Sequence, residues 1–287
     1  PLLAPFYALF FGMCVGDAGY GLLLVLLGLY LKKKVSKSMA GLMNLLITLG
    51  VATTIVGAVF NTFFGASITD LDLPEWMNSL IISGKWDGLA YDKTMVIALL
   101  VGMFHICFAM GVKAVCETVR YGFKNSLSAW AWLLLIGGSV TVATLNYLGV
   151  IDMEMSKMAF IGIGCVSAIG IYLLNNLRRN VFVNIGAGLW DTYNMATGIL
   201  GDLLSYLRLY ALGLAGGMLG GVFNSLGMQL RDAVGDFLFG IPGWICFGLI
   251  FVAGHSLNIA LSCLSGYVHS IRLTFVEYFK NSGYDGK

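Results

Sequence analysis

Long apolar stretches separated by short polar connections dominate the chain. They cover about residues 2–31, 41–64, 94–118, 127–150, 157–175, 183–228 and 241–279. About 20 helical residues cross the roughly 30 Å hydrocarbon core of a bilayer, so stretches of this length are typical of membrane helices. The pattern therefore predicts an all-α fold, a polytopic membrane helical bundle.

The first stretch and the last two are too long for one simple crossing. Gly16, Asp17, Gly19 and Gly21 disfavour a continuous helix, so we expect a turn at Asp17 and about eight transmembrane helices in total. Trp190 and Tyr193 near Asp191 predict an interfacial start for the seventh helix. The last helix would be about 60 Å long, so we expect the last two helices to be long and tilted.

The positions of Lys and Arg predict the orientation, because cytoplasmic connections carry an excess of both. A cytoplasmic N-terminus followed by a turn at Asp17 places both termini in the cytoplasm. The cytoplasmic side then holds Lys32, Lys33, Lys34, Lys37, Lys113, Arg120, Lys124, Arg178, Arg179, Lys280 and Lys287, and the opposite side holds Lys85, Lys93, Lys157 and Arg231. Arg208 and Arg272 remain inside the membrane.

Composition supports a membrane protein and excludes other classes. The chain is 58% hydrophobic and 11% charged, with a mean hydropathy of +0.84. A net charge of +2 without a basic cluster excludes a nucleic-acid partner. The six cysteines form no C-x-x-C pair, so we expect small buried hydrophobic side chains rather than disulfides or metal ligands. No cofactor is expected. The chain begins at Pro1 without a signal peptide, and we expect the membrane part of a longer polypeptide.

Arg208 lies in the middle of an apolar helix, where a guanidinium costs about 2.5–3.5 kcal/mol and must face a partner, a cavity or an ion path. Ser205 shares its helix face. Asp202 is rotated about 120° from it at 100° per residue, so no simple salt bridge between Asp202 and Arg208 is expected. The positive charge is available for something outside the helix.

A polar line follows one face of the last helix. Its members are spaced three or four residues apart: His255, Asn258, Ser262, Ser265, His269 and Arg272. Helix packing through Ser and Asn is one interpretation, and an aqueous path is the other. Two histidines and an arginine on the same line favour the path. Glu277 lies near the cytoplasmic end of this helix. It is either part of a solvated helix terminus or the entrance to the aqueous path.

Small residues follow one face of the preceding helix, at Gly213, Gly217, Gly220 and Asn224. They allow close approach of another helix, which is either a neighbouring span or a moving partner. Two further residues have open roles. Asp17 either caps a helix or handles an ion, and His105 is a hydrogen-bonded core histidine in the simpler interpretation.

Three segments resemble a known family. Residues 205–215 (SYLRLYALGLA) and 268–277 (VHSIRLTFVE) are similar to motifs of the membrane domain of the V-type/A-type ATPase subunit called I in prokaryotes and a in eukaryotes. Residues 10–21 (FFGMCVGDAGYG) resemble that family's first motif, where His is common at the position of Tyr20. Eukaryotic members carry His at the position of Gly216 and Glu at that of Ser262, so the departures fit a prokaryotic member.

The resemblance implies a single transmembrane domain over residues 1–287 in a cell membrane. Residues 1–179 would form scaffold helices, and residues 180–287 would form two long helices against a rotating ring of proteolipid subunits. The family's N-terminal cytoplasmic arm, which contacts peripheral and central stalk subunits, is absent from the chain. The resemblance also implies a non-catalytic subunit that forms two half-channels for H⁺ or Na⁺.

By the same resemblance, Arg208 and Arg272 correspond to the arginines of the seventh and eighth helices. Arg208 would release the ion from each arriving ring carboxylate, because a nearby positive charge favours the ionised carboxylate. The polar line from His255 to Arg272 would line a half-channel, with Glu277 near its mouth and Asp202 and Ser205 beside the arginine. The small face from Gly213 to Asn224 would face the ring.

Two other interpretations of the sequence do not depend on the family resemblance. A secondary transporter or channel could use Arg208 to bind an anionic substrate, which requires a polar central cavity formed by several helices. A pure scaffold would tolerate Arg208→Leu, but it leaves two costly arginines unexplained.

Overall fold

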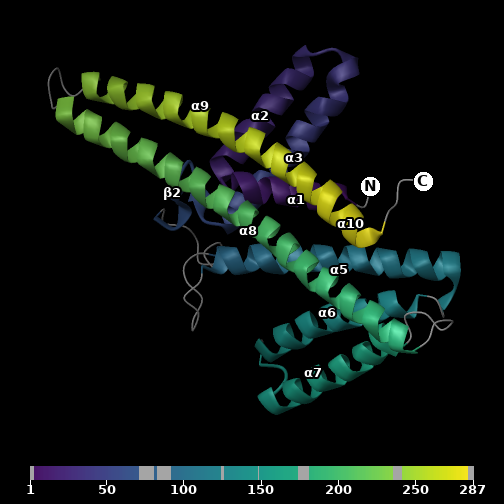
Figure 1. Cartoon of the computed structure of the whole chain (residues 1–287). Coiled ribbons are helices and arrows are strands. Elements are labelled where there is room, and N and C mark those ends of the chain that lie inside the picture. The colour runs from purple at the N-terminus through teal and green to yellow at the C-terminus, as the bar shows by residue number, and fades with distance from the viewer. Residues whose placement is uncertain are drawn as a thin grey trace. The chain divides into compact units, whose positions relative to one another are not determined.

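The structure is a computed structural model that describes residues 3–70, 81–82, 92–123, 126–147, 149–173, 181–234 and 241–283. Its helices are α1 (Ala4–Val15), α2 (Ala18–Lys34), α3 (Ala40–Val59), α5 (Lys93–Tyr121), α6 (Leu127–Tyr147), α7 (Met153–Ala168), α8 (Val181–Val234), α9 (Ile241–Arg272) and α10 (Tyr278–Ser282) (Figure 1). π-Helical turns cover Ile169–Leu173 and Leu273–Glu277, and 3₁₀ turns cover Lys37–Met39 and Ile68–Asp70. The predicted all-α membrane bundle is confirmed.

Six helical segments among the described residues are long and apolar enough to cross a membrane. They are Ala40–Val59, Lys93–Tyr121, Leu127–Asn146, Met153–Tyr172, Asn184–Val234 and Ile241–Ser282. The helices α1 and α2 have 12 and 17 residues and are therefore about 18 and 26 Å long. The chain is a multi-pass membrane protein in which two of the about eight expected membrane helices are short. Its orientation stays a prediction, and Lys85, Lys124, Arg178, Arg179 and Lys287 lie outside the described residues.

The chain forms two compact units. Unit 1 contains Pro1–Ala98 and Tyr206–Thr274, and unit 2 contains Leu99–Ser205 and Phe275–Lys287. Helix α8 runs through both, because its 54 residues are continuous from Val181 to Val234. The functional division predicted between residues 179 and 180 is a different one and stays a prediction.

The turn between α1 and α2 lies where the glycines predicted it. Helix α1 ends at Gly16 in the left-handed conformation (φ 61°), and Asp17 is the N-cap of α2. Asp17 Oδ1 accepts hydrogen bonds from the backbone N–H groups of Gly19 (2.8 Å), Tyr20 (3.2 Å) and Phe64 (2.9 Å). Its Oδ2 accepts from Gly65 N–H at 2.8 Å. The capping interpretation of Asp17 is confirmed.

Asp17 also anchors a small hairpin between α3 and α5. Strands β1 (Thr62–Phe63) and β2 (Ala66–Ser67) are antiparallel and joined by a turn in which Phe64 and Gly65 both have positive φ, at 48° and 71°. A Cβ on Gly65 would lie 2.4 Å from the carbonyl carbon of Gly220. The turn therefore packs directly on the backbone of α8.

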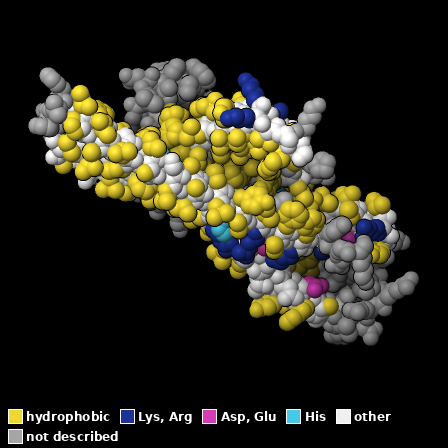
Figure 2. All heavy atoms as spheres, turned by 90° about the horizontal axis from the view of Figure 1, so that it is seen from above, with side chains coloured by type: hydrophobic (Ala, Val, Ile, Leu, Met, Phe, Trp, Pro, Cys, Tyr) yellow, Lys and Arg dark blue, Asp and Glu magenta, His cyan; other side chains and the backbone are white. Residues whose placement is uncertain are grey.

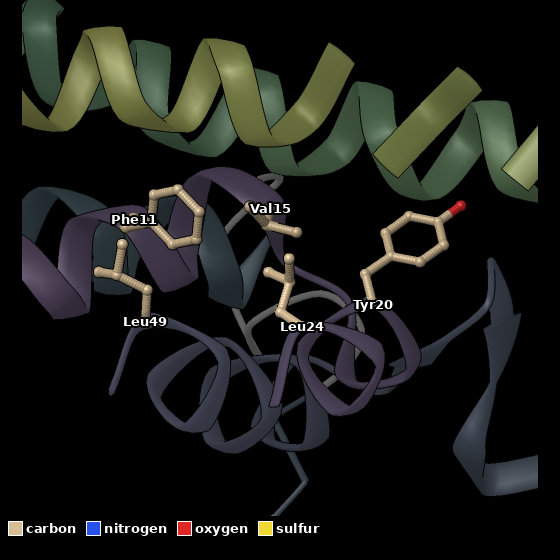
Figure 3. Packing of buried hydrophobic residues seen from close by; sticks show 5 residues of the cluster. All are labelled: Phe11, Val15, Tyr20, Leu24 and Leu49. Carbon is tan, nitrogen blue, oxygen red and sulfur yellow. The ribbon is translucent and has the colours of Figure 1, made fainter. Parts of the chain in front are cut away.

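Glycines also allow α2 and α3 to pack closely. A Cβ on Gly21 would lie 2.4 Å from the backbone N of Thr54, and one on Gly57 would lie 2.1 Å from that of Ala18. A cluster of buried side chains from α1, α2 and α3 fills the space beside this contact (Figure 3), formed by Phe11, Val15, Tyr20, Leu24 and Leu49. The three helices thus form one closely packed layer of unit 1.

Helix α9 packs antiparallel against the part of α8 in unit 1. A Cβ on Gly227 would lie 2.9 Å from Phe247, and one on Gly254 would lie 2.4 Å from Phe223. Near the C-terminal end of α8 and the N-terminal end of α9, the Arg231 guanidinium lies 5.0 Å from the Trp244 ring and pairs with Asp232 at 2.7 Å. Glycine and aromatic residues alternate across this contact.

The surface of the helices is mostly hydrophobic, with Lys and Arg in a few small groups (Figure 2). Large apolar residues such as Ile55, Ile161 and Leu249 are at least 60% exposed, as suits side chains that face lipid. The prediction that all six cysteines are buried is wrong, because only Cys14 is buried whereas Cys116 and Cys165 are exposed. A thiol is a small hydrophobe, so lipid accommodates it on the outside of a helix. All six cysteines are free.

Candidate functional site

Arg208 lies on an exposed face of α8. The outward residues recur every three or four positions: Gly201, Leu204, Arg208, Ala211, Ala215, Met218 and Val222. Leu204 and Met218 are 64% and 62% exposed, whereas Arg208 is half-buried. Among the described residues, Arg208 makes no hydrogen bond or ion pair. We call this set of seven residues the arginine face.

Arg272 and His269 lie near the end of α9 in the same unit as Arg208. Arg272 is exposed and His269 is half-buried. His269 therefore lies within electrostatic range of Arg272, which belongs to the same polar line, and of Arg208 on α8. Ser265, the next residue of the line, is also half-buried.

The other end of the polar line is buried and fully hydrogen-bonded. His255, Asn258 and Ser262 are 4%, 1% and 8% exposed. Asn258 Nδ2 donates to Tyr20 Oη and to the Gly216 carbonyl, each at 2.8 Å. His255 Nδ1 lies 2.7 Å from Tyr20 Oη, and its Nε2 lies 3.0 Å from Asn224 Oδ1.

One protonation state satisfies this whole network. Asn224 Nδ2 donates to the Phe64 carbonyl at 2.8 Å, so Asn224 Oδ1 must accept from His255 Nε2–H. Tyr20 Oη accepts from Asn258 and can donate its own proton to His255 Nδ1. A neutral His255 with its proton on Nε2 therefore satisfies both ring nitrogens. Hydrogen bonds formed within the chain favour a structural role for His255, Asn258 and Ser262. The part of these three residues in ion translocation stays a prediction.

The buried polar positions of α9 drift away from the predicted line. After Ser262 the buried face continues through Gly266 and Ser270, which is 0% exposed, to Thr274 at 3%. A Cβ on Gly266 would meet Phe11 at 3.3 Å. Sequence reasoning missed Ser270 and Thr274, although their four-residue spacing from Ser262 was visible. Each step of four residues rotates by about 400° at 100° per residue, so the buried face turns by about 40° per step away from the line.

The small face of α8 packs against its own chain. A Cβ on Gly213 would lie 2.5 Å from the Met13 carbonyl oxygen, and one on Gly220 would lie 3.0 Å from Gly65. Gly217 approaches Thr62, and Asn224 bonds Phe64 as described above. Of the two interpretations of this face, the structure supports packing between elements of one chain. The arginine face, which is roughly opposite, is the one left exposed.

Asp202 belongs to unit 2 and is tied to the C-terminal helix. It is 4% exposed, its Oδ1 accepts from Lys280 Nζ at 2.9 Å, and its Oδ2 accepts from Asn281 Nδ2 at 2.7 Å. The same Asn281 group donates to the Glu277 carbonyl at 2.8 Å, and Glu277 is 3% exposed. The carboxylate of Asp202 therefore forms its ion pair with Lys280. Ser205, at the end of unit 2, is buried.

Unit 2 has a cavity of about 410 Å³ beside this ion pair. Charged and amide side chains line it, from Lys113, Glu117, Asp191, Asn194, Lys280 and Asn281. His105 lies in the same unit, where its ring packs 5.7 Å from that of Tyr278. The described residues include no group of three or more His, Cys, Asp or Glu that could hold a metal ion.

No protein-family model matches the chain. Among curated proteins, the V-type ATP synthase subunit I of Borreliella burgdorferi is 27% identical and matches 97% of this chain and 46% of its own length. The A-type ATP synthase subunit I of Methanocaldococcus jannaschii is 29% identical, with 97% and 42% covered. That of Methanothermobacter thermautotrophicus is 30% identical, with 98% and 39% covered. The resemblance predicted from the motifs is confirmed, and the chain spans less than half the length of these relatives.

Proposed function

Because this chain is related over nearly its whole length to subunit I of V-type and A-type ATP synthases, we propose that it is the stator membrane subunit of a rotary ATPase. In this role it hydrolyses no ATP itself and moves H⁺ or Na⁺ together with a rotating ring of proteolipid subunits. The observation that carries the proposal is the half-exposed guanidinium of Arg208 on an otherwise apolar face.

The arginine face is the surface that meets the ring. Its other members are glycine, alanine and larger apolar residues, so a lipid-exposed apolar helix can slide along it without forming hydrogen bonds. On α9, Leu257, Leu261 and Leu264 are 52–65% exposed and extend the apolar surface. A moving partner needs such a surface, because strong polar contacts would hold it in one position.

Arg208 releases the ion from each ring carboxylate. A carboxylate that travels through lipid must be neutralised by a proton or a coordinated cation, since the bare charge is prohibitively costly there. Close to Arg208 the ionised form becomes favourable, so the carboxylate gives up its cation. The same positive charge repels free cations and prevents direct leakage between the two half-channels.

The ion path then follows the end of the polar line that lies beyond the network of His255 and Asn258. Ser265, His269 and Arg272 lie at that end of α9. The peripheral and central stalk subunits are partners through the cytoplasmic arm that the resemblance implies.

A secondary transporter for an anionic substrate is the alternative. It needs Arg208 to face a polar cavity enclosed by helices of its own chain. In the described structure the arginine shares an outward face with Leu204 and Met218, and the buried amide and imidazole groups are used by one another. This arrangement favours the stator.

ATP-driven cation uptake into vesicles that hold the whole complex tests the proposal. We expect Arg208→Ala to abolish uptake while the complex still assembles and hydrolyses ATP. Arg231→Ala is the matched control, because Arg231 lies on the same helix but pairs with Asp232 and Trp244 near its end. It should transport normally. Normal uptake by an assembled Arg208→Ala complex would contradict the proposal.

A further inference from the structure

An apolar groove opens at the surface of unit 1. Its volume is about 290 Å³, and residues of α1, α2, α3 and α9 line it, all of them hydrophobic. Its floor is formed by Phe11, Leu24 and Leu49, which are 3–6% exposed and belong to the buried cluster of Figure 3. Its rim includes Leu42 and Tyr267, which are 54% and 49% exposed. The groove is therefore chemically suited to a hydrocarbon chain.

The length of the groove matches an acyl chain within one leaflet. Leu42 and Leu49 are seven residues apart on α3, which corresponds to a rise of about 10 Å at 1.5 Å per residue. Half of the hydrocarbon core is about 15 Å thick. The groove thus covers most of one leaflet, and its Leu42 end lies close to the start of α3 at Ala40.

The packing of α2 on α3 places a lysine at this end of the groove. The two helices are antiparallel, and their close contacts keep one register: Ala18 with Gly57, Gly21 with Thr54, Val25 with Gly50, and Gly28 with Ile47. Four residues beyond Gly28 on α2 is Lys32, and four residues before Ile47 on α3 is Met43, which lines the groove. Lys32 is therefore level with the end of the groove.

Lys32 belongs to a group of lysines that no nearby acidic residue balances. Lys32, Lys33 and Lys34 end α2, and Lys37 begins the 3₁₀ turn that follows. The sequence from α2 through β2 contains no Asp or Glu. Lys34 Nζ donates to Tyr30 Oη at 3.4 Å, whereas Lys32 and Lys33 are exposed and make no hydrogen bond or ion pair among the described residues. Their charges are available to a ligand.

We propose that the groove and these lysines form a site for one anionic phospholipid, with an acyl chain between α3 and α9 and the phosphate group at Lys32 and Lys33. The ammonium groups donate to the phosphate oxygens. Lysines that only orient a helix pair in the membrane need no groove beside them, so the two features together indicate the lipid. The site uses neither Arg208 nor the polar line and goes beyond the proposed function. A lipid bound there would join the α2–α3 pair to α9.

Photocrosslinking in the whole complex tests the site. The complex is placed in phosphatidylcholine nanodiscs with a small fraction of phosphatidylglycerol or of phosphatidylcholine, each carrying the same diazirine-bearing acyl chain. Each basic residue near an anionic headgroup changes affinity about fivefold, so phosphatidylglycerol should label residues 42–49 and 263–267 at least tenfold more than phosphatidylcholine does. Raising the salt concentration from about 0.1 M to about 1 M should remove most of this preference, because the screening length falls from about 10 Å to about 3 Å.

Substitutions separate the headgroup contact from the acyl-chain contact. Lys32→Gln combined with Lys33→Gln should lower the phosphatidylglycerol preference at least fivefold. Lys157→Gln is the control, because Lys157 is exposed on α7 and pairs with Glu154, and it should leave the preference unchanged. Leu42→Trp fills the groove entrance and should reduce labelling by both lipids. Ile55→Trp, at an exposed position of α3 that does not line the groove, should reduce neither.

The wild-type comparison needs no variant and can overturn the proposal alone. Equal labelling of the groove by the two lipids would show that no anionic headgroup is selected. A phosphatidylglycerol preference that survives the double lysine substitution would overturn the headgroup contact. If neither lipid labels residues 42–49, another occupant such as a second protein chain covers the groove and the proposal is wrong. The Arg208→Ala transport assay has no bearing on these results, so the proposed function and the lipid site stand or fall separately.

Discussion

Replacing Asp17 by Asn tests whether this buried carboxylate holds unit 1 together. Asp17 is 1% exposed and accepts four backbone hydrogen bonds from two chain segments. In the Asp17→Asn variant the amide nitrogen of the new side chain would face the Gly65 N–H, so one charge-assisted bond is lost and two donors oppose each other. A lost bond to a charged group costs about 1.5–3 kcal/mol and an unsatisfied buried donor about 1–3 kcal/mol. We expect a loss of about 2.5–6 kcal/mol in the free energy of unfolding.

The measurement is reversible denaturation in mixed detergent micelles, followed by helix content. Asp152→Asn is the control, since Asp152 occupies the N-cap position of α7 without a side-chain hydrogen bond and should change stability by less than about 0.5 kcal/mol. Equal stabilities of Asp17→Asn and Asp152→Asn would refute the reasoning. If Asp17→Asn were stable but lost transport, Asp17 would handle ions instead of capping α2.

Three further substitutions test other contacts by the same denaturation measurement. Gly65→Ala should cost about 2–5 kcal/mol, because it adds strain at φ 71° to a clash with α8, whereas Gly122→Ala, at φ 81° with open space around it, should cost only about 1–2 kcal/mol. Equal costs would contradict the close packing of the hairpin. Tyr20→Phe removes the hydroxyl shared by His255 and Asn258 and should cost about 1–3 kcal/mol; no change would mean that the network is not formed. Asp202→Asn should cost only about 1 kcal/mol, because Lys280 keeps half of its side chain exposed, and a larger loss would show that the ion pair is shielded from solvent.

The sequence predicted those features that local chemistry decides. The glycines around Asp17 predicted the break between α1 and α2, since they disfavour helix wherever they cluster. The lengths of the apolar stretches predicted the helices to within a few residues. Each of these follows from residues close together in the chain.

Features that depend on distant residues were not predictable. A stripe of glycines shows that something approaches closely, but the approaching group at Gly220 is Gly65, more than 150 positions earlier. The hairpin around Gly65 is too short to give an alternating hydrophobic pattern. Asp92 and Tyr210 were missed for the same reason, because only the fold brings them together.

The placement of the hairpin also determines which face of α8 a partner can reach. Gly65 and Asn224 hold the hairpin against the small face, so that face cannot meet another protein while the contact exists. The arginine face is then the side of α8 left for a partner in unit 1. Hydrogen bonds within the unit satisfy His255, Asn258 and Asn224, whereas none forms to Arg208 among the described residues. The buried polar groups of unit 1 therefore hold the helices in place. The guanidinium of Arg208 is left to act on the proposed moving partner.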